Sequence, residues 1–242
     1  MDIRDLFVSV KANGTPKCSA VILAAGNSTR MGEDKIMLEL CGNPLILRTL
    51  EVFQQSELVN EIIVVTNKEK LERIASLVKS HNLTKVSKVI LGGETRSESS
   101  LAGACAVSKK AKLIAIHDGA RPFVTEKLIK NCVFSAVEFN AAVPGTKIND
   151  TLKTSKDGIV SGTVNRDETV SIQTPQVFNA DLIKGALTYV VEKKIEVTDD
   201  SSAIEYLGVK VRIVEGDPDN IKLTTPSDIK KAESILKNRG ER

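Results

Sequence analysis

Continuous apolar runs, separated by stretches with helical character, are the feature of this sequence that most restricts its fold. Each run is rich in β-branched residues and does not alternate polar with apolar side chains, which is typical of a strand buried on both faces of a sheet. Strands that alternate with helices form mainly parallel sheets with right-handed crossovers and helices on both faces. We therefore predict a doubly wound, mainly parallel α/β fold, whose ligands bind at the carboxyl ends of the strands. The runs are SAVILAA (19–25), EIIVVT (61–66), KVIL (88–91), KLIAIH (112–117) and AAVP (141–144).

Helix starts between these runs are marked by capping residues. Helices are predicted to begin at Asn43-Pro44, at Thr125-Glu126 and at Thr225-Pro226, where a capping side chain is followed by a proline or an acidic residue. We expect residues 1–18 to form an N-terminal lead and residues 19–239 to form one domain.

The alternation of long apolar runs with helical stretches stops between about residues 148 and 177, where short polar and apolar stretches alternate instead. A turn signal, Lys156-Asp157-Gly158, lies within this segment. The pattern predicts a β-hairpin extension rather than another strand-helix-strand unit. We expect this arm to be a candidate for contact between subunits.

The amino-acid composition limits the classes of molecule that this protein is expected to bind. Of 242 residues, 41% are hydrophobic and 27% are charged, which is typical of a globular protein. Aromatic residues make up only 3%, with no Trp, which disfavours a stacking platform for single-stranded nucleic acid. The formal net charge is +3, and Lys and Arg are interspersed with Asp and Glu, so nucleic acid is not an expected partner.

Membrane, secretion and zinc signals are also missing from the sequence. No apolar run approaches the ~20 residues of a membrane span, and the N-terminal stretch carries Asp2 and Asp5 instead of a long apolar region. The four cysteines are widely spaced, which favours reduced thiols over disulfides or a zinc site. We expect a cytoplasmic protein.

A glycine bend follows the first apolar run, in VILAAGNSTRMGEDK (21–35). Gly26 is free to adopt a positive φ, and successive small residues let backbone N–H groups approach an anion. Arg30 and Lys35 lie shortly after it and favour a phosphate ligand. The two commonest phosphate-binding patterns are absent, and a plain strand-to-loop turn is the alternative.

Two further strand ends carry polar residues. HDGARP (117–122) places Asp118 where a carboxylate would hold a divalent cation against phosphates; alternatively, Asp118 caps the loop and pairs with Arg121. His117 is expected to give hydrogen-bonding support rather than to act as a ligand. GGETRSESS (92–100) permits backbone contacts to a base or ribose, with Ser97 or Ser99 as a helix cap that faces the ligand, or it is an ordinary turn.

Taken together, these stretches resemble the 2-C-methyl-D-erythritol 4-phosphate cytidylyltransferases of the non-mevalonate isoprenoid pathway. The resemblance covers about Ser19 to Ile229. It implies a Rossmann-like nucleotidyltransferase fold and transfer of CMP from CTP to the phosphate of the acceptor. The stretches that carry it are VILAAGNSTRMG, GGETRSESS, HDGARPF, SIQTPQVF, TDDSSAIEYLG and VEGDPDNIKLTTPSDI.

The resemblance also implies roles for individual residues. Arg30, Lys35 and Lys222 would be catalytic, neutralising the triphosphate and the charge that develops at the α-phosphorus. Asp118 would help to place Mg²⁺. The residues implied to bind CTP are Ala24, Ala25, Gly26, Gly93, Glu94 and Ser99.

An acceptor site shared between two chains is implied as well. Asp118, Arg121 and Thr174 would contribute to it from one chain. In this family the arm crosses to a partner, so Thr151 and Arg166 would hold the acceptor phosphate from the other chain of a homodimer.

One departure separates this chain from the family pattern. The family commonly has three residues between R-M-G and P-K-Q, whereas RMGEDKIML brings Lys35 two positions closer to Arg30 and has neither Pro nor Gln.

A ribitol 5-phosphate cytidylyltransferase and a non-catalytic CTP-binding regulator remain the alternatives. A dinucleotide-binding oxidoreductase is disfavoured because the first turn lacks its glycine fingerprint.

Overall fold

The computed structural model describes residues 15–26 and 35–240. Within them, the strands of the main sheet are β1 (Cys18–Leu23), β4 (Val59–Thr66), β5 (Val86–Leu91), β6 (Leu113–Asp118), β7 (Ala141–Lys147), β10 (Val170–Ile172), β11 (Gln176–Asn179) and β12 (Arg212–Glu215). Two separate pairs are β2 (Glu39–Leu40) with β3 (Asn43–Pro44) and β8 (Lys153–Lys156) with β9 (Ile159–Thr163). The helices are α2 (Leu45–Gln55), α3 (Lys68–Ser80), α4 (Arg96–Ala106), α5 (Glu126–Phe139), α6 (Ala180–Glu192), α7 (Asp200–Tyr206) and α8 (Pro226–Asn238), with a 3₁₀ turn η1 (Arg166–Glu168).

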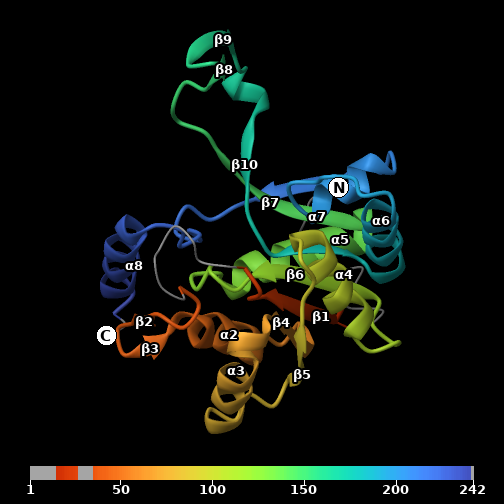
Figure 1. The fold of residues 1–242 in the computed structure, drawn as a ribbon, viewed down its shortest axis with the longest axis vertical. Coiled ribbons are helices and arrows are strands. Elements are labelled where there is room, and N and C mark those ends of the chain that lie inside the picture. Colours follow the sequence, from red (N-terminus) through yellow and green to blue (C-terminus); the bar gives the residue numbers. More distant parts are fainter. Residues whose placement is uncertain (1–14, 27–34, 241–242) are drawn as a thin grey trace.

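The main sheet has the order β10-β7-β11-β6-β1-β4-β5, with β12 paired to β7 (Figure 1). Strands β1, β4, β5 and β6 run parallel, as do β7 and β12. All five predicted strands are present. Strands β11 and β12 were not predicted from the sequence, and β11 lies antiparallel between β6 and β7. The sheet is therefore mostly parallel, with an antiparallel insertion.

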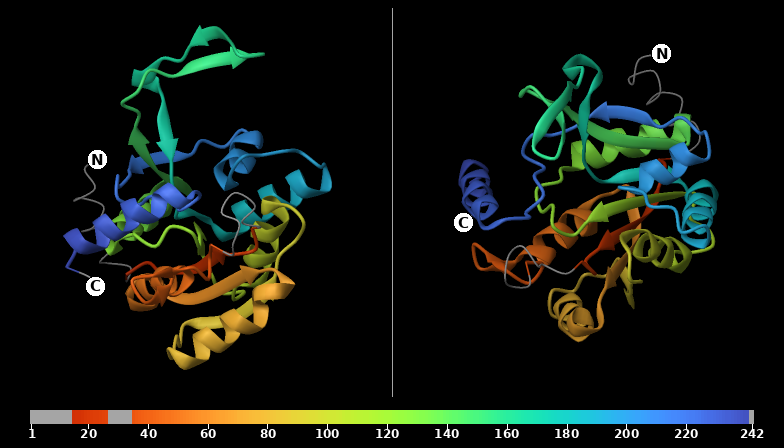
Figure 2. Two further views of the ribbon diagram at one scale, coloured as in Figure 1. Left: turned by 60° about the vertical axis from the view of Figure 1, so that its left-hand side comes forward. Right: turned by 45° about the horizontal axis from the view of Figure 1, so that its top comes forward.

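Helices cover both faces of the sheet, as Figure 2 shows in two orientations. Alternate residues of β1 face opposite sides: Ala20 and Ile22 pack with α2, α5 and α8, whereas Val21 packs with α4, α6 and α7. Because both faces are buried, the strands are apolar at consecutive positions and do not alternate. The prediction of burial on both faces is wrong for residues 88–91, because β5 lies at the edge of the sheet, has no fully buried residue and leaves Leu91 51% exposed.

The predicted helix starts are only partly reproduced. Thr125 caps α5 by accepting a hydrogen bond from the Leu128 N–H, and Asp228 accepts from the Thr225 N–H at 2.9 Å at the start of α8. At Asn43-Pro44 the chain instead forms β3, and α2 begins at Leu45. Pro44 lacks an N–H, so it is tolerated immediately before the first turn of the helix.

The segment from 148 to 177 divides into two parts. Strands β8 and β9 form a hairpin through Asp157 and Gly158, both with positive φ, and this arm projects from the body of the molecule (Figure 1). Residues Val170–Ile172 instead pair with β7 in the main sheet. Contact of the arm with a second subunit remains a prediction, as do the 1–18 and 19–239 boundaries.

None of the helices in the described part of the chain combines the length and the apolar character that crossing a membrane requires.

Two glycines in helices differ in the space around them, because α4 packs closely on the sheet at Gly103 and α6 has open space at Gly185. A Cβ at Gly103 would collide with Val21 and lie 2.8 Å from Val65 Cγ2, whereas a Cβ at Gly185 of α6 would have nothing within 4 Å. We expect Gly103→Ala to lower the free energy of unfolding by about 1–3 kcal/mol through overpacking. Gly185→Ala should raise it by about 0.5–1 kcal/mol through helix propensity. Urea denaturation measures both, and equal effects would contradict this packing.

Candidate functional site

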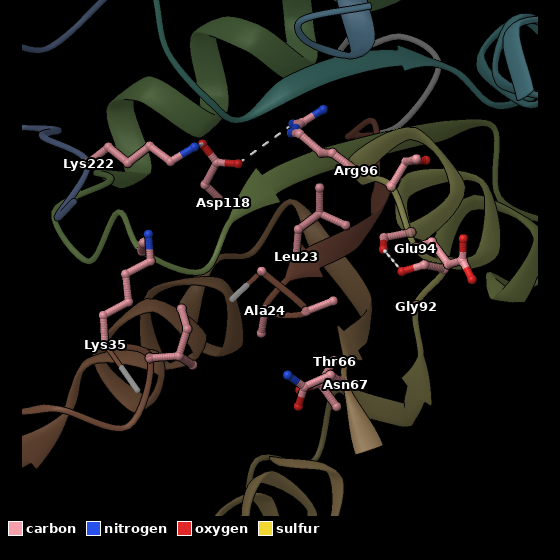
Figure 3. Close-up of a pocket in the computed structure, with 17 residues that line it drawn as sticks. Leu23, Ala24, Lys35, Thr66, Asn67, Gly92, Glu94, Arg96, Asp118 and Lys222 are labelled. Atoms are coloured by element: carbon pink, nitrogen blue, oxygen red, sulfur yellow. Dashed lines mark hydrogen bonds and ion pairs between the residues drawn. The ribbon is translucent and has the colours of Figure 1, made fainter. Parts of the chain in front are cut away.

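A cleft of about 370 Å³ opens at the carboxyl ends of the central parallel strands (Figure 3). It is lined by residues that follow β1, end β4, follow β5 and end β6, together with Lys35 and Lys222 from more distant segments. The glycines and polar residues that line it are Gly26, Lys35, Thr66, Asn67, Gly92, Gly93, Glu94, Thr95, Arg96, Ser99, Asp118 and Lys222. This is the edge of the sheet at which the doubly wound topology predicts a ligand.

The glycine bend forms one wall of the cleft. The Ala24 N–H donates to Val65 O at 2.7 Å and so extends the pairing of β1 with β4 by one residue. Ala24, Ala25 and Gly26 all line the cleft, and so does Lys35, where the described chain resumes. Arg30 lies outside the described residues.

The loop after β5 lies beside the bend, where a Cβ at Gly92 would come within 3.1 Å of Ala25 Cβ, and forms a second wall of the cleft. Glu98 Oε2 accepts from the Glu94 N–H at 2.6 Å and from the Thr95 N–H at 3.0 Å, while Thr95 Oγ1 accepts from the Glu98 N–H at 3.1 Å. This reciprocal capping box starts α4, so the helix cap is Thr95 and not Ser97 or Ser99.

The pair of glycines in that loop is required by close packing. A Cβ at Gly93 would lie 2.6 Å from Glu98 Oε2, and one at Gly92 would collide with Ser99 Oγ. Ser99 is buried beside them and lines the cleft. The loop therefore presents backbone rather than side chains to a ligand at this point.

Asp118, at the end of β6, is a buried carboxylate among three cations. Lys222 Nζ lies 2.9 Å from its Oδ2, Arg121 Nε 3.4 Å from Oδ2, and Arg96 Nη2 3.6 Å from Oδ1. Burial alone would raise the pKa of Asp118, but the charges of Lys222, Arg96 and Arg121 outweigh it and hold that pKa well below its usual range. The carboxylate is therefore ionised at neutral pH.

Arg96 links this carboxylate to a second one that sequence analysis did not identify. Its Nη2 lies 2.7 Å from Asp200 Oδ2, and the Asp200 side chain is completely buried at the start of α7. Both residues lie in stretches that carried the family resemblance, but no local pattern indicates that they meet. Asp200 holds the Arg96 guanidinium beside Asp118.

Behind Asp118, polar side chains form a buried support. The Asp118 N–H donates to Thr174 Oγ1 at 3.1 Å, and Thr174 Oγ1 lies 3.0 Å from His117 Nδ1. His117 Nε2 lies 3.1 Å from Arg121 O. A carbonyl only accepts, so Nε2 carries the proton and Nδ1 accepts from the Thr174 hydroxyl.

His117 is neutral in this arrangement. Burial lowers the pKa of His117 to about 4, because removal from water disfavours the imidazolium. Both ring nitrogens are used in holding Thr174 and the backbone of Arg121. This agrees with the expected supporting role of His117.

The remaining predicted residues fall in two places. Arg121 is anchored by donating through Nη1 to Asn220 O at 2.8 Å, and Asn220 Nδ2 donates to Thr174 O at 2.8 Å, so Arg121 and Thr174 lie in one network beside Asp118. Thr151 precedes β8 of the projecting arm, and Arg166 begins η1 and donates through Nη1 to Asn149 O; neither residue lines the cleft of its own chain.

Known proteins match this chain over most of its length. A family model described as 2-C-methyl-D-erythritol 4-phosphate cytidylyltransferase matches residues 18–238. Curated proteins of that name are similar to it: the one from Clostridium novyi is 39% identical over 92% of this chain and 97% of its own length. The one from Halalkalibacterium halodurans is 40% identical over 93% and 99%, respectively.

Solved structures are similar as well. The crystal structure of 4-diphosphocytidyl-2C-methyl-D-erythritol synthase from Anaerococcus prevotii has a TM-score of 0.82 and 31% identity, covering 93% of this chain and 100% of that one. The structure of 2-C-methyl-D-erythritol 4-phosphate cytidylyltransferase from Thermus thermophilus has a TM-score of 0.74 and 29% identity, covering 90% and 98%.

Two buried threonines of this region should respond oppositely to one substitution. Thr174 Oγ1 serves both His117 and the Asp118 N–H, whereas Thr66 Oγ1 has no hydrogen-bond partner among the described residues. We expect Thr174→Val to lower the free energy of unfolding by about 1–3 kcal/mol, and Thr66→Val to leave it unchanged or raise it by up to about 1 kcal/mol. Urea denaturation measures both, and equal losses would mean that shape rather than hydrogen bonding governs this region.

Proposed function

Since the chain belongs to the 2-C-methyl-D-erythritol 4-phosphate cytidylyltransferase family, we propose that the strand-end cleft is the site of its reaction. The enzyme transfers CMP from CTP to the phosphate of 2-C-methyl-D-erythritol 4-phosphate, giving 4-diphosphocytidyl-2-C-methyl-D-erythritol and pyrophosphate. The observation that carries the assignment of the cleft is Asp118, which pairs with Leu23 beside the glycine bend and holds Lys222, Arg96 and Arg121 around one point.

The two walls of the cleft suit the two ends of CTP. On one side, Ala24, Ala25 and Gly26 would receive the phosphates and ribose, because their small side chains let the backbone approach. On the other side, Gly93, Glu94 and Ser99 would read the cytosine. The tight packing at Gly93 and the buried position of Ser99 support this division.

Cationic side chains would make the main contribution to catalysis. Arg30, Lys35 and Lys222 would neutralise the triphosphate and the charge that develops at the α-phosphorus. An oxygen of the acceptor phosphate attacks the α-phosphorus in line, that new P–O bond forms, and the bond to the pyrophosphate leaving group breaks. Because a phosphate monoester is already nucleophilic, positioning and electrostatics suffice and no general base is needed.

A divalent cation is consistent with this family, and we propose Mg²⁺ held through Asp118. Within the described ranges no cluster of three or more His, Cys, Asp or Glu side chains could chelate a metal by itself. One ionised carboxylate completed by phosphate oxygens is, however, how Mg²⁺ is usually held beside a nucleotide. When bound, the cation would neutralise phosphate charge and orient the leaving group.

Arg121 and Thr174, in the network beside Asp118, would help to place the acceptor.

We further propose a homodimer in which the arm completes the partner's site. Ile159 and Val160, on β9 of the arm, are 73% and 61% exposed, and contact with a partner subunit would bury their apolar surface. Thr151 and Arg166 would then reach the acceptor phosphate bound by the other chain.

We place the enzyme in the cytoplasm. Cys18, Cys41, Cys105 and Cys132 are all free thiols, which suits a reducing compartment.

Pyrophosphate release tests the reaction and the cleft together. We expect release from CTP and Mg²⁺ with 2-C-methyl-D-erythritol 4-phosphate and not with D-ribitol 5-phosphate.

Lys222→Met should lower kcat/KM by at least about 100-fold, because it removes a cation that stabilises the transition state. Lys193→Met, on an exposed lysine at the end of α6, is the matched control. Normal turnover by Lys222→Met would contradict the proposed site, and CTP binding without release would indicate a regulator.

Mixing two inactive variants tests the shared site. Lys222→Met impairs the body of one chain and Arg166→Met impairs its arm, so each homodimer should be inactive. A mixed dimer contains one site with an intact body and an intact arm, and random mixing should therefore restore about a quarter of wild-type activity. Refolding the two variants together and measuring pyrophosphate release checks this. Activity that stays at the level of the separate variants would contradict a shared site.

A further inference from the structure

Lys70, in the first turn of α3, is a buried cation directly behind the glycine bend. The residue is only 5% exposed. Its Nζ donates to Gly26 O at 3.1 Å, and a longer contact of 3.5 Å reaches Ala24 O. No motif in the sequence indicates a role for Lys70.

The start of α3 places Lys70 at this position. Asn67 caps the helix, and its side chain accepts from the Lys70 N–H at 3.2 Å. Asn67 also lines the cleft, and the preceding strand accepts the Ala24 N–H through Val65 O. The glycine bend and the first turn of α3 are therefore fixed to each other by backbone and side-chain contacts.

This is a costly place for an ammonium group. Burial removes it from water, and the first turn of a helix carries the positive end of the helix dipole, which disfavours a cation. The neighbouring Lys68 occupies the same turn but is exposed. A buried cation here is therefore better explained by what it does for the glycine bend than by the stability of α3.

Its contacts orient the backbone of the bend. A trans peptide places its C=O and N–H on opposite edges. The carbonyl of Ala24 shares a peptide group with the N–H of Ala25, so an Ala24 oxygen turned toward Lys70 directs the Ala25 N–H away from the ammonium. The carbonyl of Gly26 is turned toward the same ammonium. Carbonyl oxygens, which repel phosphate, are thus held at the back of the bend.

We propose that Lys70 is a positioning residue for the nucleotide. It holds the Ala24 and Gly26 carbonyls, turns the Ala25 amide to a triphosphate in the cleft, and adds a positive charge beneath it. The inference rests on the proposed function, since it takes the cleft to be the CTP site.

The test measures CTP affinity by titration calorimetry, together with the KM values and kcat of the full-length enzyme. Lys70→Met, which keeps the aliphatic stem, should raise the Kd and KM for CTP about tenfold, the effect of one hydrogen bond to a charged group. The KM for the acceptor should stay within about twofold, a split that a loss of folded protein would not produce. Lys70→Gln is a second neutral variant with the same expected direction, should Lys70→Met fail to fold.

Two control variants distinguish the effect of the positive charge on CTP affinity from the effect of its position in the first turn of α3. Lys70→Arg should restore CTP affinity to within about threefold, because it returns a cationic donor. Lys68→Met removes the same charge from the exposed side of the same turn and should leave CTP affinity unchanged. Unchanged CTP affinity in Lys70→Met, or an equal loss in Lys68→Met, would overturn the proposal.

A third variant distinguishes failure of this proposal from failure of the site. Gly93→Val alters the wall formed by the loop after β5, where its side chain would collide with Glu98. If Gly93→Val weakens CTP binding and Lys70→Met does not, the role of Lys70 is wrong and the cleft stands. If neither variant weakens it, the assignment of the cleft is wrong, and the role of Lys70 falls with it.

Discussion

The rest of the site depends on the neutralisation of one buried carboxylate. Asp118 ends a central strand and is largely removed from water, which would be unfavourable for an isolated charge. Lys222, Arg121 and Arg96 compensate it from three different segments of the chain. The same interaction that makes the buried charge tolerable thus gathers the cations at one edge of the sheet.

This arrangement suits a reaction that needs positioning more than covalent help. The cations are held by buried partners before any ligand arrives: Asp200 fixes Arg96, and Asn220 fixes Arg121. Groups that are already oriented need little reorganisation as charge develops in a transition state. The neutral His117 and the Thr174 hydroxyl complete the support without adding a competing charge.

Much of the fold could be predicted because its signals are local. A strand buried on both faces must be apolar at consecutive positions, so strands such as β1 and β4 were visible as runs, whereas β5 has an apolar run although it lies at the edge of the sheet. Strands β11 and β12 were missed because QVFN and RIVE each contain only two consecutive apolar residues, flanked by polar ones. The cap of α4 was misplaced for a related reason: Thr95, Ser97 and Ser99 are all capping types, and only the geometry with Glu98 selects Thr95.

The α/β class, the glycine bend, the polar residues at the strand ends and, through its motifs, the family could all be inferred from the order of the residues. These properties depend on residue type and short spacing, which are present in the unfolded chain. The contact of Lys222 with Asp118, the link from Asp118 through Arg96 to Asp200, and the position of Lys70 behind the bend are established only by the folded chain. Ion pairs and hydrogen bonds act over a few ångströms in space, so residues far apart in sequence interact only after the sheet has brought them together.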